Sequence, residues 1–432
     1  MKVTFIQPNM SASRSGDAMQ PLSFAILSGL TPPSVDRVLF DERLERIRFE
    51  EPTDLVALSV NTFSAKRAYA IADAFHARGI PVVMGGFHPT FMPEEAHGHA
   101  DSLVIGDAED TWPSLLEDFM NGALKSEYRG DMNRPLDGLF FDRSIFRKKR
   151  YLGMTPVQFG RGCRFACDFC CIRSFYGPTR RSRPAGEVAA EIAGLASKNV
   201  FFVDDNMLLD RERLIDLLSR LAPLGRRWAC QISMDAAGDA GLLRLMRRSG
   251  CMAVYIGLES LDSANVAQMG KAPNRGVEYA GAVRRFKDHG IMVCGSFVFG
   301  YDGDTVRSVE RSVRFARRAG LCLSHFNILF PTPGTPIYER LRRENRLPYG
   351  EWWMSDAFRY DACYMEPLGM TAGELESAIY RARRSFNSAP SIVGRALDRK
   401  ANARTPFNLL VYLAANLINR REVGRKRGLR LG

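Results

Sequence analysis

Four cysteines lie within nine residues of this 432-residue chain. Cys163, Cys167 and Cys170 have a C-x3-C-x2-C spacing, with Phe169 directly before the third thiol and Cys171 directly after it. Three thiolates on one short loop can each bind one iron of a cubane cluster, which leaves a fourth iron open to a ligand. Zinc is the alternative, but it takes four closed ligands and the segment contains no histidine, so Cys171 or a distant residue would have to complete the site. The spacing therefore favours an iron–sulfur centre.

The other five cysteines are scattered singly along the chain. The first residues, MKVTFIQPN, contain neither an apolar stretch of signal-peptide length nor a small-residue cleavage site. We therefore expect a cytoplasmic, reducing environment, in which clustered cysteines bind metal rather than form disulfides. The scattered cysteines are predicted to be small buried hydrophobic residues: Cys230, Cys251, Cys294, Cys322 and Cys363.

Length and composition exclude several classes of protein. The length suits two or three domains, and with 25% charged and 46% hydrophobic residues the chain is not intrinsically disordered. No segment reaches the ~18 consecutive apolar residues that a membrane-spanning helix needs. The formal net charge of +12 is uneven, with −8 on residues 1–140, +11 on 141–370 and +9 on 371–432. A basic surface suits nucleic acid, an anionic membrane or an anionic substrate, and a solvated helix face is the plain alternative.

Six short apolar runs in the second part of the chain alternate with segments of helical spacing. This alternation predicts a parallel barrel or partial barrel, whose reactive groups lie on the loops after the strands. The cysteine cluster follows the first of these strands directly. The predicted strands are 157–160, 200–203, 228–232, 253–258, 293–299 and 324–330, and the helices between them include 186–197, 211–221, 240–249, 276–289 and 305–319.

The first part of the chain also alternates, and we predict a doubly wound parallel sheet for it. Two of its strands end in loops of small and polar residues, 59–62 and 85–88. Because ligands bind beyond the carboxyl ends of strands in such sheets, these loops are the expected mouth of a site. The predicted strands are 3–7, 38–40, 55–60, 81–84 and 102–105, with a helix at 65–78.

The fold class predicted for the whole chain is therefore α/β. We place an α/β domain at 1–135, a partial (β/α)6 barrel at 136–345 and a mostly helical cap with a basic tail at 346–432. Residues 122–152 are rich in Gly, Asp and Arg and lack periodicity, so they are interpreted as a linker.

The cysteine spacing at the head of a β/α series resembles the radical S-adenosylmethionine (SAM) superfamily. The resemblance implies that Cys163, Cys167 and Cys170 hold a [4Fe-4S] cluster, that SAM chelates its open iron, and that SAM cleavage gives a 5′-deoxyadenosyl radical. Cys171 lies outside the pattern. The residues that the resemblance places at SAM are Phe169, Asp204, Asp205, Gln231, Ser233, Gly257, Glu259 and Ser296. For Asp204 and Asp205, capping of the following helix is the alternative.

The first domain resembles the cobalamin (B12)-binding domain that precedes the barrel in one radical SAM subclass. The residues that the resemblance places at cobalamin are Ser59, Asn61, Thr62, Gly85, Gly86, His88, Gly106 and Glu109. The D-x-H-x-x-G signature that gives cobalt a histidine ligand in many cobalamin proteins is absent, so His88 is not assigned to cobalt. A domain that kept the fold and lost the cofactor is the alternative.

Together the resemblances imply a cobalamin-dependent radical SAM enzyme. They favour a methyltransferase acting on an unactivated carbon of a small-molecule or natural-product intermediate, with methylcobalamin as the methyl carrier. SAM would be both radical source and methyl donor, and an external electron donor such as flavodoxin or ferredoxin is implied. A radical cyclase or oxidoreductase is the alternative, and a metal-stabilised nucleic-acid-binding protein is a more distant one. The sequence identifies no catalytic residue.

The basic tail follows a short apolar helix candidate, 407–418. An amphipathic helix with a basic rim suits peripheral contact with a membrane surface, and it would suit an anionic or lipid-associated substrate. A helix docked on the barrel with a frayed basic end is the alternative. No aromatic residue follows Tyr412, which argues against nucleic-acid binding by the tail. The expected location is therefore the cytoplasm, with peripheral membrane contact as a possibility to test.

Overall fold

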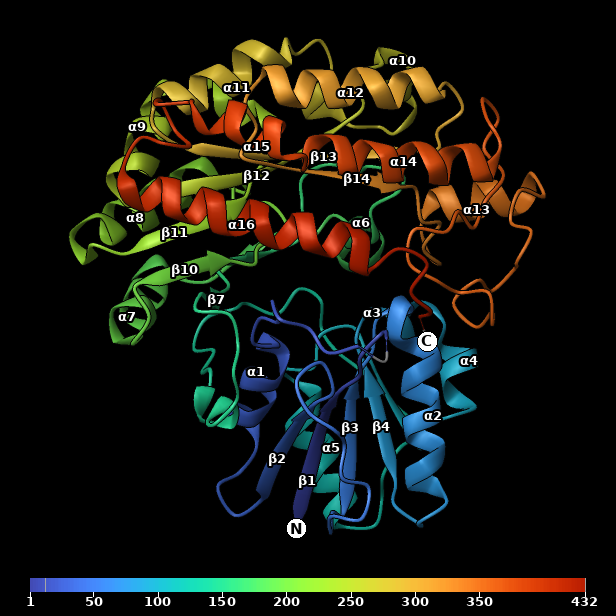
Figure 1. The fold of residues 1–432 in the computed structure, drawn as a ribbon. Helices are drawn as coiled ribbons and strands as arrows, with labels where there is room; N and C mark the ends of the chain where they lie inside the picture. Colours follow the sequence, from blue (N-terminus) through green and yellow to red (C-terminus); the bar gives the residue numbers. More distant parts are fainter. Residues whose placement is uncertain (12, 432) are drawn as a thin grey trace.

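The computed structural model describes residues 1–11 and 13–431, which form two α/β units and a helical C-terminal part (Figure 1). The first unit is drawn in blue and teal, and the second lies above it in green to orange. Each unit is built on one parallel sheet, as the two series of strand–helix alternations predict.

The first sheet is six-stranded and parallel throughout, in the order β2-β1-β3-β4-β5-β6. Along β3, Val56 and Leu58 face the core that contains α2, whereas Leu55 and Ala57 face the core that contains α1 and α5. Helices therefore cover both faces, and the predicted doubly wound sheet is confirmed. The strands are β1 (Lys2–Gln7), β2 (Asp36–Asp41), β3 (Leu55–Ser59), β4 (Val82–Gly85), β5 (Ser102–Ile105) and β6 (Glu127–Arg129). The helices are α1 (Leu22–Leu30), η1 (Thr62–Ser64), α2 (Ala65–His76), α3 (Phe87–Phe91), α4 (Pro93–His97) and α5 (Thr111–Met120).

The segment 122–152 is not a plain linker. It contributes β6 to the edge of the first sheet, followed by the short helix η2 (Arg143–Phe146). Phe141 and Phe146 are buried in the core beneath α1. A three-residue strand is too short to show a two-residue alternation, so the sequence pattern missed it.

The second sheet is also six-stranded and parallel, in the order β14-β13-β12-β11-β10-β7. It confirms the predicted partial β/α barrel. Its strands are β7 (Thr155–Val157), β10 (Asn199–Phe202), β11 (Arg227–Gln231), β12 (Cys251–Glu259), β13 (Met292–Phe299) and β14 (Leu323–Ile328). Its helices are α7 (Ala185–Gly194), α8 (Arg211–Leu221), η3 (Ala222–Leu224), η4 (Met234–Gly238), α9 (Ala240–Arg248), α10 (Ser263–Gln268), η5 (Ala272–Asn274), α11 (Tyr279–Asp288) and α12 (Val306–Arg318).

The predicted strand 157–160 is not one continuous strand, because β7 ends at Val157 and a second short strand begins at Gly160. The chain leaves the barrel after β7 and forms a small antiparallel pair, β8 (Gly160–Arg161) with β9 (Arg181–Ser182). The cysteine segment and the short helix α6 (Cys171–Tyr176) lie between the two short strands. The cysteine segment is therefore a loop closed by a two-stranded clasp.

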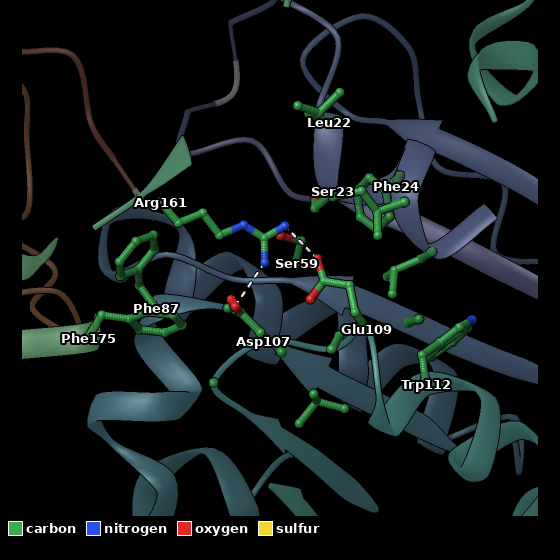
Figure 2. A pocket seen from close by; sticks show the side chains of 18 of the residues that line it. Leu22, Ser23, Phe24, Ser59, Phe87, Asp107, Glu109, Trp112, Arg161 and Phe175 are labelled. Carbon is green, nitrogen blue, oxygen red and sulfur yellow. Dashed lines mark hydrogen bonds and ion pairs between the residues drawn. The ribbon is translucent and has the colours of Figure 1, made fainter. Parts of the chain in front are cut away.

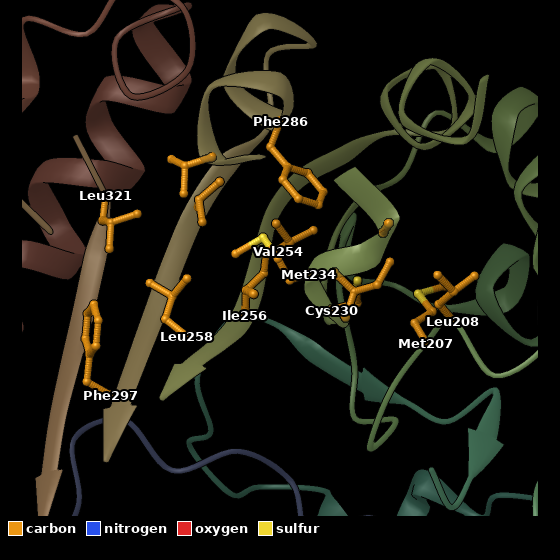
Figure 3. Close-up of a cluster of buried hydrophobic side chains, with 14 of the residues drawn as sticks. Met207, Leu208, Cys230, Met234, Val254, Ile256, Leu258, Phe286, Phe297 and Leu321 are labelled. Atoms are coloured by element: carbon orange, nitrogen blue, oxygen red, sulfur yellow. The ribbon is translucent and has the colours of Figure 1, made fainter. Parts of the chain in front are cut away.

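Alternation along β12 explains how the barrel makes both a core and a cavity. Val254, Ile256 and Leu258 are buried against the outer helices, in the cluster drawn in Figure 3. Tyr255 and Gly257 point to the opposite, inner side, where a cavity lies. Because successive side chains of a strand point to opposite faces, the outer face of β12 forms the core and its inner face lines the cavity.

The C-terminal part consists of α13 (Pro336–Arg343), α14 (Ala372–Phe386), α15 (Ala389–Ala396) and α16 (Pro406–Arg425). Tyr412 of α16 is buried with Met292, Cys294 and Cys322 of the barrel. Buried Arg395 of α15 donates to the carbonyl oxygens of Leu321, Cys322 and Phe386. The tail helix is thus docked on the barrel, and no helix in the described part of the chain is long and apolar enough to cross a membrane.

The end of the chain returns to the first unit. Trp352, Trp353, Phe358 and Leu431 are buried in the same core as α2 and β3. The backbone amide of Leu431 donates to the carbonyl of Phe358, and that of Tyr360 donates to the carbonyl of Leu429. Residues from the C-terminal part therefore complete the hydrophobic core of the first unit.

Candidate functional site

A cavity of ≈ 580 Å³, here called the barrel cavity, opens at the carboxyl ends of β10 to β14. Cys163, Cys167 and Cys170 line it, whereas Cys171 does not. This is the edge of a parallel barrel where reactive groups are expected. The structure thus brings the three predicted cluster thiols together with the strand ends.

The cysteine loop is held in place by two adjacent carboxylates at the end of β10. Asp204 is fully buried and accepts hydrogen bonds from the backbone amides of Phe159 and Gly160. Asp205 accepts one from the amide of Gly162, at 2.9 Å. A side chain at Gly162 would place its Cβ 2.2 Å from the carbonyl oxygen of Thr179, so the clasp requires glycine there.

The donor set of the loop suits a polynuclear cluster. Among residues 1–11 and 13–431, no three Cys, His, Asp or Glu side chains converge closely enough to hold one metal ion. A mononuclear zinc site needs such convergence, whereas in a cubane cluster each thiolate binds its own iron. Three thiols that line one cavity suit a cluster with an open iron.

Asp204 does not line the barrel cavity, and its contact with SAM stays a prediction. Both oxygens of its carboxylate accept hydrogen bonds from backbone amides directly before the cysteines, so Asp204 positions the cysteine loop. The capping alternative is wrong, because Asp210 caps α8. Burial raises the pKa of Asp204 to about 7 and that of Asp205 to about 6.

The raised pKa of Asp204 makes stability depend on pH. Because the folded pKa lies above the ordinary value of 3.8, the folded chain binds the proton more tightly, and the free energy of unfolding falls as pH rises through this range, from 3.8 to about 7. We expect Asp204→Asn to reduce this slope, since an amide does not titrate. Part of the slope should remain in this variant, because the pKa values of Asp205 and Asp304 are also raised, to about 6.

Urea unfolding of the cofactor-free chain at about pH 5 and about pH 8 measures the slope. Asp210→Asn is the matched control, because this exposed residue keeps its helix-capping role as asparagine. An Asp204→Asn variant with the slope of the unaltered chain would contradict the prediction.

The other residues predicted at SAM do line the barrel cavity: Phe169, Asp205, Gln231, Ser233, Gly257, Glu259 and Ser296. Sequence reasoning missed several polar neighbours. Asn206 donates to Ser233 Oγ at 3.2 Å, and Asn327 donates to Ser296 Oγ at 3.2 Å. His325 and Tyr255 line the same wall with their rings stacked, and burial lowers the pKa of His325. Polar residues two apart on an otherwise apolar strand, as in 323–328, are the signal that could have found them.

Glu259 and Lys271 form a buried ion pair at the cavity wall, 2.8 Å apart. Glu259 has a positive φ of 59°, at a point where the pairing of β12 with β13 shifts register. This bulge turns Glu259 inward while Leu258 stays in the outer core. A Cβ at Gly257 would lie 2.0 Å from Glu259 Oε1, so this glycine makes room for the pair.

A second cavity of ≈ 330 Å³, here called the junction cavity, lies where the first unit meets the barrel (Figure 2). Apolar side chains such as Phe24 and Trp112 line part of it. Five residues predicted at cobalamin line it as well: Ser59, Gly85, Gly86, Gly106 and Glu109. They come from the carboxyl ends of β3, β4 and β5, where a ligand of a doubly wound sheet is expected.

The other three predicted cobalamin residues do not line the junction cavity, and their contact with cobalamin stays a prediction. Asn61 caps η1 by accepting from the amide of Ser64. Thr62 is buried beneath it, 3.3 Å from His88 Nδ1. His88 is itself fully buried, with Nε2 3.1 Å from the hydroxyl of Tyr69 and 3.0 Å from Glu95 Oε1. It is a satisfied core histidine, in line with its exclusion from cobalt binding.

Arg161 joins the two units at the junction cavity. Its guanidinium lies 2.8 Å from Asp107 and 2.5 Å from Glu109, both on the loop after β5. Arg181 of β9 also contacts Asp107, at 2.5 Å. All four side chains are less than a tenth exposed, so the pairs are protected from solvent screening. Arg161 is two residues before Cys163, and the network therefore fixes the cysteine loop relative to the first unit.

Helix α6 is a shared wall between the two cavities. Ile172 lines the barrel cavity, while Phe175 and Tyr176, one turn later, line the junction cavity. Phe175 packs against Phe87 of the first unit, with ring centroids 4.5 Å apart. Ligands in the two cavities would therefore be separated by little more than this six-residue helix.

Comparison with known proteins gives two domain matches. Residues 157–316 match the radical SAM superfamily, and residues 26–116 match the B12-binding domain. The bacteriochlorophyllide d C-12(1)-methyltransferase of Chlorobaculum tepidum is 29% identical over 93% of this chain and 90% of that protein. The anaerobic magnesium-protoporphyrin IX monomethyl ester cyclase of Cereibacter sphaeroides is 23% identical over 89% of this chain and 70% of that protein.

Among solved structures, the radical SAM methyltransferase TsrM from Kitasatospora setae, with cobalamin and a [4Fe-4S] cluster bound, has a TM-score of 0.64. It is 16% identical and the match covers 89% of this chain and 81% of that one, so the likeness shows a shared fold. The barrel, its cysteine loop and the domain match define a radical SAM enzyme. With its B12-binding domain, the chain belongs to the cobalamin-binding subclass of that superfamily. Its cofactors are accordingly a [4Fe-4S] cluster, SAM and cobalamin.

Proposed function

We propose that this enzyme is a methyltransferase that adds a methyl group to an unactivated carbon of a small molecule. The observation that carries the proposal is the shared wall α6, which puts the thiol-lined barrel cavity and the junction cavity on its two sides. Such a layout places the cavity of a radical source next to the cavity of a methyl carrier. The curated relative that is 29% identical over most of the chain is named a methyltransferase, which supports the same reaction.

In this proposal the chain's residues hold and orient the reactants and exclude water. Cys163, Cys167 and Cys170 hold the cluster, which supplies the electron for SAM cleavage when bound. The polar lining of the barrel cavity, with the Glu259–Lys271 pair at its wall, orients SAM. Ser59, Gly85, Gly86, Gly106 and Glu109 form the cobalamin side, and bound cobalamin carries the methyl group.

Atom balance gives a product ratio that tests the proposal. Each methylation consumes one SAM as radical source, giving 5′-deoxyadenosine and methionine, and one SAM as methyl donor, giving S-adenosylhomocysteine. We expect equal amounts of 5′-deoxyadenosine and S-adenosylhomocysteine from the loaded enzyme with SAM, acceptor and a flavodoxin or ferredoxin as electron donor. With SAM deuterated at its methyl group, the product should gain one CD3 group by mass spectrometry.

A radical cyclase is the second candidate, because a cyclase relative covers 89% of this chain. Ring formation would remove hydrogen from the acceptor, give no labelled product and form 5′-deoxyadenosine without matching S-adenosylhomocysteine. The same assay therefore separates the two reactions, and the second pattern would overturn the methyltransferase proposal.

A further inference from the structure

Exposed apolar side chains gather on the two last helices. Val393 of α15, Leu397 directly after α15, and Leu410, Leu417 and Ile418 of α16 are 45% to 76% exposed. They are five of the eleven large exposed hydrophobic residues in the described part of the chain. We call these five residues the apolar strip. The opposite face of α16, with Asn408, Tyr412 and Asn416, is buried on the barrel, so the strip faces away from the protein.

Two hollows lined by arginines flank the apolar strip. The first, of ≈ 390 Å³, lies between α12 and α15 and is lined by Arg314, Arg317 and Arg318 with Ser391 and Gly394. The second, of ≈ 380 Å³, lies at the start of α16 and is lined by Arg226, Arg227, Arg247 and Arg248 with Phe407. Figure 1 shows α15 beside the first half of α16, with α12 beyond α15. The hollows and the strip therefore belong to one side of the molecule.

The positive charge of these hollows is not neutralised within the protein. Neither hollow has a carboxylate in its lining, and none of the eight arginines that line them, Arg395 included, forms an ion pair among the described residues. Their hydrogen-bond acceptors are neutral: Arg226 donates to the carbonyls of Ser197 and Ala193, and Arg247 to that of Cys251. Arg227 stacks on Phe407, 4.0 Å from the ring centroid. The guanidinium groups of Arg226, Arg227 and Arg247 are thus held in position while their charge is left for an outside anion.

The formal charge of the whole chain is concentrated on the same elements. Helix α12 carries five arginines against one glutamate, and residues 389–432 carry ten basic against two acidic side chains. Together they equal the chain's entire net charge of +12. An apolar strip with a cationic border is the pattern of a surface that binds an anionic bilayer interface.

We propose that the side of the protein formed by α12, α15 and α16 docks on an anionic membrane. The apolar strip enters the headgroup region, and the two arginine hollows bind lipid phosphates, which match the guanidinium geometry. A second copy of the chain fits less well, because two such faces would bring like charges together. Nucleic acid also fits less well, because the strip has no aromatic residue for base stacking. The proposal does not depend on the reaction that the enzyme catalyses.

The test is flotation of the full chain with phosphatidylcholine vesicles, with and without phosphatidylglycerol. We expect binding to the anionic vesicles, weakened by salt, and little binding to the neutral ones. Leu410→Ser with Leu417→Ser, and separately Arg314→Gln with Arg317→Gln and Arg318→Gln, should each lower the partition coefficient at least about tenfold. These side chains are at the surface, so the variants should fold, and circular dichroism checks that they do.

Matched controls lie on the first unit. Phe140→Ser removes an equally exposed apolar side chain, at 68%, and Lys125→Gln with Arg129→Gln removes exposed charges. These variants should bind vesicles like the unaltered chain. Binding that survives the strip and hollow variants would overturn the proposal. So would a strip-dependent dimer in light scattering, or a hollow-dependent affinity for nucleic acid, when vesicle binding is absent.

Discussion

Loss of bound iron is the expected result of replacing Cys163, Cys167 and Cys170 together by alanine. The three thiols are the ones of the cysteine segment that line the barrel cavity, whereas Cys171 does not line it. Each is expected to bind its own iron, so their removal leaves no anchor for a cluster. Without the cluster no electron reaches SAM, and we expect 5′-deoxyadenosine formation to fall below detection. Iron and sulfide analysis after anaerobic reconstitution, together with the SAM cleavage assay, measures both effects.

Cys171→Ala is the matched control for this prediction. Cys171 neighbours Cys170 in sequence, but it begins α6 and does not line the barrel cavity. We expect this variant to keep most of the iron and most of the SAM cleavage. Iron retained by the triple variant, or lost from Cys171→Ala alone, would show that the cluster ligands are assigned wrongly.

The second large effect is expected at Arg161. Replacing it by methionine leaves Asp107 and Glu109 buried, with only Arg181 to offset two negative charges. Breaking a buried ion network by removing one partner typically costs about 3–5 kcal/mol, because a buried charge is left uncompensated. We expect a loss of that size in the apparent free energy of unfolding, measured by urea denaturation of the cofactor-free chain.

Arg164→Met is the control, since Arg164 lies on the same loop and pairs with Asp235 where both side chains are about a third exposed. A pair of that kind contributes at most about 1 kcal/mol. Adding Glu109→Gln to Arg161→Met should restore part of the lost stability by removing one uncompensated charge. If the Arg161 and Arg164 variants lose the same amount, the buried network is not what joins the units.

The sequence pattern predicted both sheets, because alternating apolar runs and helical periods follow directly from the geometry of strands and helices. The cysteine loop was also predictable, since its residues are close in sequence and their spacing is itself the signal. The domain boundaries at 135 and 345 stay predictions, and the burial of Trp352 and Leu431 in the first core shows that the C-terminal part packs with more than one unit.

Residues whose partners are distant in sequence were harder to assign. Asp204 and Asp205 are adjacent at a strand end, so they point to different sides, and the pattern does not tell which one faces the cavity. His88 follows a glycine pair that suggested a ligand-binding loop, yet its ring is buried and hydrogen-bonds to Tyr69 and Glu95. Arg161 is inside the cysteine segment, but its partners Asp107 and Glu109 are more than fifty residues away. Only the fold brings such pairs together.

The return of the chain to its first unit also affects the order in which the protein can fold during synthesis. The B12-binding domain precedes the barrel in the chain, but its core includes Trp352, Trp353, Phe358 and Leu431, which are synthesised after the barrel. One face of its sheet therefore stays incompletely covered until the barrel and the C-terminal part have been translated. We therefore expect the N-terminal domain to be unstable when it is expressed without the C-terminal part.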